Sequence, residues 1–88
     1  MLVRHHPRFD VHYKKRIAPL VGLNRKFKER MNLFLLNPQH PVLKDHPLKG
    51  SRNLFRAFSI TGDLRVIYRR INKDEVILMD VGSHNQVY

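Results

Sequence analysis

The sequence predicts an α+β fold in which an antiparallel pair of helices packs on a small antiparallel sheet. Three observations support this prediction. Apolar residues recur at helical spacing up to position 37, three prolines then exclude a helix between positions 37 and 47, and three strand-like runs follow. A chain of 88 residues holds one domain, residues 1–88.

Two helices are predicted, near residues 8–18 and 22–37. In the first, Phe9, Tyr13 and Ile17 recur every four residues, and Pro19 ends the pattern. The short connector 19–22 predicts that the second helix runs back antiparallel to the first. The apolar stripe of the second helix, which we interpret as core, contains Leu23, Phe27, Met31, Phe34 and Leu35.

Strands are predicted at 53–60, 64–71 and 75–82, with turn-rich triplets between them, and a short edge strand at 1–4. Side chains alternate between the two faces of a strand, so Leu64, Val66 and Tyr68 share the face that covers the helices. Arg65 then points to the opposite, open face, as does Asp63 if the turn keeps the alternation.

The first strand alternates less cleanly. Phe55, Ala57 and Ser59 share one face, and both faces carry apolar residues. The other face carries Leu54, Arg56, Phe58 and Ile60.

The charge balance points to a polyanionic partner. Seventeen Lys and Arg against seven Asp and Glu give a net charge of +10, and the pI is near 10.7. The longest apolar stretch, 33–36, is far shorter than the roughly 20 residues of a membrane-spanning helix. No apolar stretch of signal-peptide length begins the chain, so a cytoplasmic, nucleic-acid-facing domain is expected. The absence of cysteine excludes disulfides and thiolate metal sites.

Three motifs occur in order along the second half of the chain. Residues 44–50 read K-D-H-P-L-K-G, residues 64–69 read L-R-V-I-Y-R, and residues 82–88 read G-S-H-N-Q-V-Y. Together with the order of elements, they resemble the YafQ-like branch of the RelE/ParE superfamily. The likeness spans nearly the whole chain and is weakest before Leu23.

The resemblance implies a RelE/ParE-like fold, with the short N-terminal strand beside the three-stranded meander and the active site on the concave face of the sheet. It also implies the toxin of a type II toxin–antitoxin pair, a ribosome-dependent endoribonuclease that cuts messenger RNA. The expected partners are the ribosome, messenger RNA and a cognate antitoxin, a small and acidic protein. No cofactor and no metal are expected.

Metal-independent RNA cleavage needs a base for the ribose 2′-hydroxyl, an acid for the leaving 5′-oxygen and positive charge on the phosphate. The resemblance assigns this chemistry to His46, Asp63, Arg65 and His84. We expect His84 to be the acid, His46 or Asp63 the base and Arg65 the phosphate ligand. We expect the terminal Tyr88 to stack on a base or orient His84.

RNA contacts are expected from residues around these positions, and the basic helix faces suggest further contact with ribosomal RNA. Position 59 departs from the family pattern, because YafQ-like toxins often carry a histidine there and a serine cannot shuttle a proton at neutral pH. The expected RNA-binding residues are Lys44, Lys49, Arg52, Arg56 and Ser59.

Plainer alternatives remain at each position. His46 could cap a turn, Asp63 could be an ordinary turn residue, Arg65 a solvated charge and His84 a structural turn residue. Two other functions also remain open: a ParE-like inhibitor of DNA gyrase without catalysis, and a small basic RNA-binding protein. The remaining histidines match no motif and are expected at the surface; they are His5, His6, His12 and His40.

Overall fold

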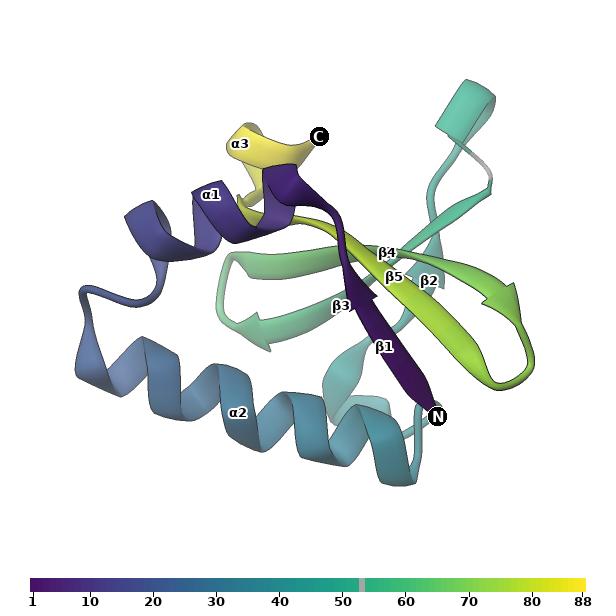
Figure 1. The fold of residues 1–88 in the computed structure, drawn as a ribbon, viewed down its shortest axis with the longest axis horizontal. Helices are drawn as coiled ribbons and strands as arrows, with labels where there is room; N and C mark the ends of the chain where they lie inside the picture. The colour runs from purple at the N-terminus through teal and green to yellow at the C-terminus, as the bar shows by residue number, and fades with distance from the viewer. Residues whose placement is uncertain (53) are drawn as a thin grey trace.

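The computed structural model describes residues 1–52 and 54–88. Two helices cover one face of a five-stranded sheet with strand order β1-β5-β4-β3-β2 (Figure 1), which confirms the predicted α+β fold. The helices are α1 (Pro7–Arg16), α2 (Val21–Leu36) and α3 (His84–Val87), with 3-10 turns η1 (Pro41–Leu43) and η2 (Gly50–Arg52). The strands are β1 (Leu2–His5), β2 (His46–Pro47), β3 (Phe55–Thr61), β4 (Leu64–Asn72) and β5 (Glu75–Ser83).

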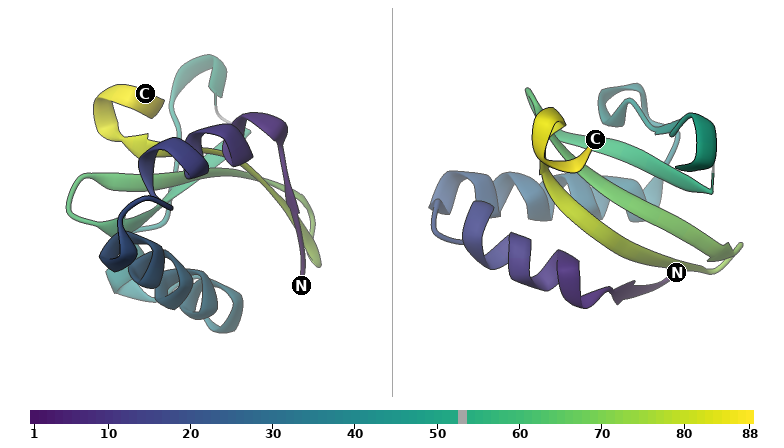
Figure 2. Two further views of the ribbon diagram at one scale, coloured as in Figure 1. Left: turned by 60° about the vertical axis from the view of Figure 1, so that its left-hand side comes forward. Right: turned by 90° about the horizontal axis from the view of Figure 1, so that it is seen from above.

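Helices α1 and α2 begin and end within two residues of the predicted bounds. The first turn of α1 contains Pro7 and is capped by the His6 ring, whose Nδ1 accepts the Arg8 N–H at 3.0 Å. A short connector at one end of the molecule turns the chain back into α2 (Figures 1 and 2). The two helices meet through aromatic rings, with Phe27 edge-on to Tyr13 at a centroid separation of 4.9 Å. The predicted antiparallel hairpin is therefore confirmed.

The meander is antiparallel as predicted, but the complete sheet is mixed. Strand β1 pairs with β5 in parallel, from Leu2 opposite Glu75 to His5 opposite Leu78. About 70 residues separate the two strands in sequence, so no hairpin turn dictates their relative direction. The two-residue strand β2, in a segment predicted as extended or turn backbone, pairs with β3. Of the predicted strand 53–60, residue 53 lies outside the described residues, and β3 begins at Phe55.

Each face of the sheet has its own apolar cluster. On the helix side Val66 and Tyr68 are fully buried and Leu64 packs against them, as the alternation predicts. The opposite face carries a smaller cluster of Leu48, Ala57, Ile67 and Val87, with Phe55 and Met79 packed against it. This second cluster explains the apolar residues on both faces of β3. In the part of the chain that the structure describes, no helix is long and apolar enough to cross a membrane.

Candidate functional site

A hollow of about 320 Å³ lies on the face of the sheet opposite α2, where β2, η2 and α3 meet. Three predicted site residues, His46, His84 and Tyr88, line it together. The predicted RNA-binding residues Lys49 and Arg52 line it as well. The remaining lining residues are Pro47 and Leu48.

The His46 ring is oriented by a main-chain contact. Its Nδ1 lies 2.8 Å from the carbonyl oxygen of Lys44, which has left-handed backbone with φ 50°. A carbonyl oxygen can only accept, so Nδ1 carries the proton, and in the neutral ring Nε2 carries the lone pair. That Nε2 lies 3.4 Å from the Tyr88 hydroxyl, at the long limit of a hydrogen bond. The lone pair of His46 Nε2 therefore points toward Tyr88, which lines the same hollow.

The C-terminal helix α3 brings His84 and Tyr88 together. The Gln86 side chain accepts the Ser83 N–H at 2.7 Å, which closes the first turn of the helix. The Tyr88 N–H then donates to the His84 carbonyl at 3.0 Å. The two rings meet edge to face, with centroids 4.5 Å apart.

Two side chains approach the glycine before this helix closely. A Cβ at Gly82 would lie 2.6 Å from Arg16 Nη1 and 2.7 Å from Gln86 Oε1. Arg16 is itself held by the Val81 carbonyl, to which it donates at 2.8 Å. The G-S-H motif thus has three roles: the Arg16 side chain of α1 packs against its glycine, its serine caps α3, and its histidine is the site residue His84.

Two arginines act on the Tyr88 hydroxyl. Partial burial raises the pKa of Tyr88 above its ordinary value, and the charges of Arg65 and Arg52 partly oppose this rise. Tyr88 is therefore a neutral phenol at physiological pH, able to donate a proton in a hydrogen bond but not to act as a base. Because their charges lower the pKa of Tyr88, Arg65 and Arg52 lie close enough to act on a group in the hollow.

The sheet register gives the direction of Arg65. Arg65 of β4 pairs with Ser59 of β3. Two residues away along both strands, Ile67 pairs with Ala57, and these two residues belong to the apolar cluster on the α3 side. Pairs two residues apart share a face, so the half-buried Arg65 points to the α3 side, as the alternation predicts. Asp63 is exposed in the β3–β4 turn and is not among the residues that line the hollow.

The other predicted RNA-binding residues do not line the hollow. Lys44 is exposed and contributes its carbonyl to His46. Ser59 is buried, with 4% of its surface exposed. Arg56 lies on the opposite face, where its Nε donates to Asp45 Oδ1 at 3.0 Å. The prediction of Arg56 as an RNA contact stays a prediction; its side chain is 40% exposed and lies away from the hollow.

The Asp45 carboxylate is a structural feature that the sequence analysis missed. Its Oδ2 accepts the Tyr68 hydroxyl at 2.5 Å, and its side chain is 11% exposed. Burial first, and then Asp45, raise the pKa of Tyr68 well above its ordinary range. Asp45 thereby ties the segment that carries His46 to the centre of the sheet. The only sequence signal for this role is the position of Asp45 in the K-D-H-P motif.

Among residues 1–52 and 54–88, no group of three or more His, Cys, Asp or Glu side chains is arranged to hold a metal ion. The residues that line the hollow provide imidazole, guanidinium, ammonium and phenol groups.

This fold and site define a class, the small toxins of type II toxin–antitoxin systems. The family model of the bacterial toxin of the type II toxin–antitoxin system, YafQ, matches residues 2–88. The chain belongs to this family.

Solved structures agree over almost the whole chain. A mutant of YafQ from E. coli superposes with a TM-score of 0.80 at 25% identity, covering 98% of this chain and 96% of that one. YafQ in the E. coli DinJ–YafQ complex gives a TM-score of 0.79 at 25% identity, with the same coverage. A metal-bound toxin from Helicobacter pylori gives 0.77 at 28% identity, covering 100% and 99%. No curated protein matches the chain.

Proposed function

We propose that this toxin is a cytoplasmic endoribonuclease that cuts messenger RNA on the ribosome, without a metal ion or cofactor. The observation that carries the proposal is the orientation of His46. Its Nε2 lone pair points toward Tyr88, which lines the same hollow as His84. The charges of Arg65 and Arg52 act on Tyr88. A base, an acid and a phosphate ligand are what cleavage by the ribose 2′-hydroxyl requires.

The reaction would use the two histidines in turn. His46 Nε2 takes the proton of the 2′-hydroxyl, whose oxygen forms a bond to the adjacent phosphorus. The bond from phosphorus to the 5′-oxygen breaks, and His84 gives a proton to that oxygen. The products are a 2′,3′-cyclic phosphate and a 5′-hydroxyl, so atoms and charge balance. Each proton transfer by a positioned group contributes about 10²- to 10⁴-fold.

Arg65 and Arg52 supply the positive charge in this proposal. A guanidinium stays charged at every relevant pH, and its planar fork fits two phosphate oxygens. The charge that builds up on the pentacoordinate phosphate is stabilised more than the ground state, which lowers the barrier. Tyr88, a neutral phenol, would orient the His46 and His84 rings or stack on a base.

A cognate antitoxin is the second proposed partner. The E. coli relative has been crystallised with DinJ, and this chain matches the YafQ of that complex along 98% of its length. A net charge of +10 favours an acidic protein that covers the basic surface. Such binding would also stabilise a small domain by mass action.

Primer extension on messenger RNA after induced expression tests the proposal. We expect new 5′ ends within translated messages for the wild type and none for His84→Ala. The matched control is His5→Ala, an exposed histidine on β1 at the opposite edge of the sheet from His46, which should cut normally. Intact messages together with DNA damage would instead indicate the gyrase-inhibitor alternative.

A further inference from the structure

A second hollow adjoins the first on the same face of the sheet. Its volume is about 120 Å³, and it is lined by Arg8, Arg52, Phe55, Ile67, Met79 and Asp80. Arg52 lines both hollows, so the two are neighbours.

The lining of this second hollow has two parts. Its floor is apolar and comes from three adjacent strands, with Phe55 on β3, Ile67 on β4 and Met79 on β5. Its rim carries two cations from elements far apart in the sequence, Arg8 on α1 and Arg52 on η2. An apolar floor fits the face of a nucleobase, and flanking guanidinium groups fit its phosphates or stack on it.

Asp80 adds a hydrogen-bond acceptor to this basic surface. Three groups approach its Oδ1: the Val81 N–H at 2.8 Å, His12 Nδ1 at 2.5 Å and Arg16 Nη1 at 3.8 Å. Asp80 lines the hollow with a side chain that is 14% exposed, and Oδ2 is the oxygen that we assign to a ligand there. A carboxylate repels phosphate and therefore faces the edge of a base.

We propose that this second hollow binds the nucleotide next to the cleaved linkage and selects bases that carry an exocyclic amino group. Adenine, cytosine and guanine can donate such an N–H to Asp80 Oδ2. Uracil has no amino group, and its one N–H on that edge stands between two carbonyl oxygens, which the carboxylate repels. This inference rests on the proposed ribonuclease function, because the first hollow must contain the cut.

Cleavage of programmed ribosomes tests the selection. Four messages differ only in the base at each position flanking the cut, and single-turnover rates are measured for the purified toxin. At one flanking position we expect uracil to be cut about tenfold more slowly than the other bases, the effect of one hydrogen bond to a charged group. Asp80→Asn should abolish this preference. Its amide oxygen stays with the Val81 N–H, and its NH₂ group then donates to the uracil carbonyl oxygens.

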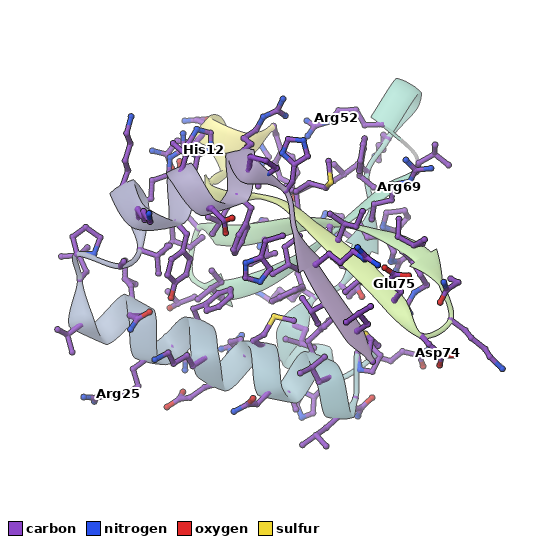
Figure 3. The ribbon with its side chains drawn as sticks, in the orientation of Figure 1. His12, Arg25, Arg52, Arg69, Asp74 and Glu75 are labelled. Atoms are coloured by element: carbon purple, nitrogen blue, oxygen red, sulfur yellow. The ribbon has the colours of Figure 1, made fainter. Side chains whose placement is uncertain are left out.

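Two further variants test the apolar floor and the basic rim of the second hollow separately. Met79→Ala, which leaves the Asp80 contacts in place, should weaken cleavage of all four messages and keep their order. Arg8→Ala should weaken RNA binding equally for all four and reduce its salt dependence by about one phosphate contact. Arg25→Ala, an exposed arginine on α2 at the far side of the molecule (Figure 3), is the matched control and should change neither.

The outcomes separate the two proposals. Equal cleavage of all four messages by the wild type, or an unchanged order in a folded Asp80→Asn variant, would overturn the second subsite and leave the ribonuclease standing. A wild-type protein that cuts no message would overturn the ribonuclease and the subsite with it.

Discussion

Replacing His46 by asparagine would separate the proton chemistry of this residue from its structural contact. The amide nitrogen of asparagine occupies nearly the position of Nδ1 and can donate to the Lys44 carbonyl, as the ring does at 2.8 Å. Nothing in asparagine replaces Nε2. Loss of a positioned base should slow cleavage by about 10²- to 10⁴-fold, or about 3–6 kcal/mol in the barrier at about 1.4 kcal/mol per tenfold.

The effect of this substitution on stability should be far smaller. His46 is exposed and contributes to neither apolar cluster. A surface substitution of this kind changes the free energy of unfolding by about 0.5 kcal/mol or less. For a domain of this size, that is a shift in Tm of about 2–4 °C. A large loss of rate with a small change in Tm is thus the expected signature.

The assay is single-turnover cleavage of a message on programmed ribosomes, with ribosome pelleting to measure binding and circular dichroism to follow melting. We expect binding to stay within about threefold of the wild type, because the base acts in the transition state. A folded His46→Asn variant that cuts within threefold of the wild-type rate would refute the assignment. Asp63→Asn would then be the next variant to measure.

Three further outcomes follow from the same geometry. Arg65→Ala should lower the single-turnover rate while ribosome pelleting shows nearly unchanged binding. Gly82→Ala should displace Gln86 from the helix start, cost about 1–2 kcal/mol in a denaturant titration and reduce cleavage. The raised pKa of Tyr68 means that the unfolded chain loses its proton first, so the free energy of unfolding should fall as pH rises above the ordinary tyrosine value of 10. In urea titrations Tyr68→Phe should reduce that fall, by at most about 1.4 kcal/mol per pH unit, and should destabilise the protein at neutral pH because Asp45 loses a donor.

Local patterns predicted the local elements. The helices and the meander follow from spacing within a few residues of each position, and their observed bounds lie close to the predicted ones. Helix α3 has four residues, too few for any periodicity, so its sequence read as a turn. The direction of β1 and the pairing of β2 depend on contacts with distant strands, which no local pattern reports.

The grouping of the site residues came from the resemblance rather than from spacing. His46 and Tyr88 are 42 positions apart, and only the folded sheet brings them together. The alternation along β3 places Arg56 and Ser59 on opposite faces of the sheet. In the structure Arg56 pairs with Asp45 on the face away from the hollow. The burial of the Asp45 carboxylate has no signal in composition or periodicity.

Position 59 bears on where the proposed proton transfer takes place. Ser59 is 4% exposed, so a proton-shuttling side chain at this position would have to emerge from the sheet to reach substrate. The side chains proposed to do the chemistry, His46 and His84, are instead exposed. The Lys44 carbonyl orients the His46 ring, and the contact between Ser83 and Gln86 closes the first turn of the helix that carries His84. An exposed side chain contributes little to the free energy of unfolding, so a proton-transfer residue at such a position costs the protein little stability. We therefore propose His46, rather than a side chain at position 59, as the base. The His46→Asn variant is the experiment that decides this assignment.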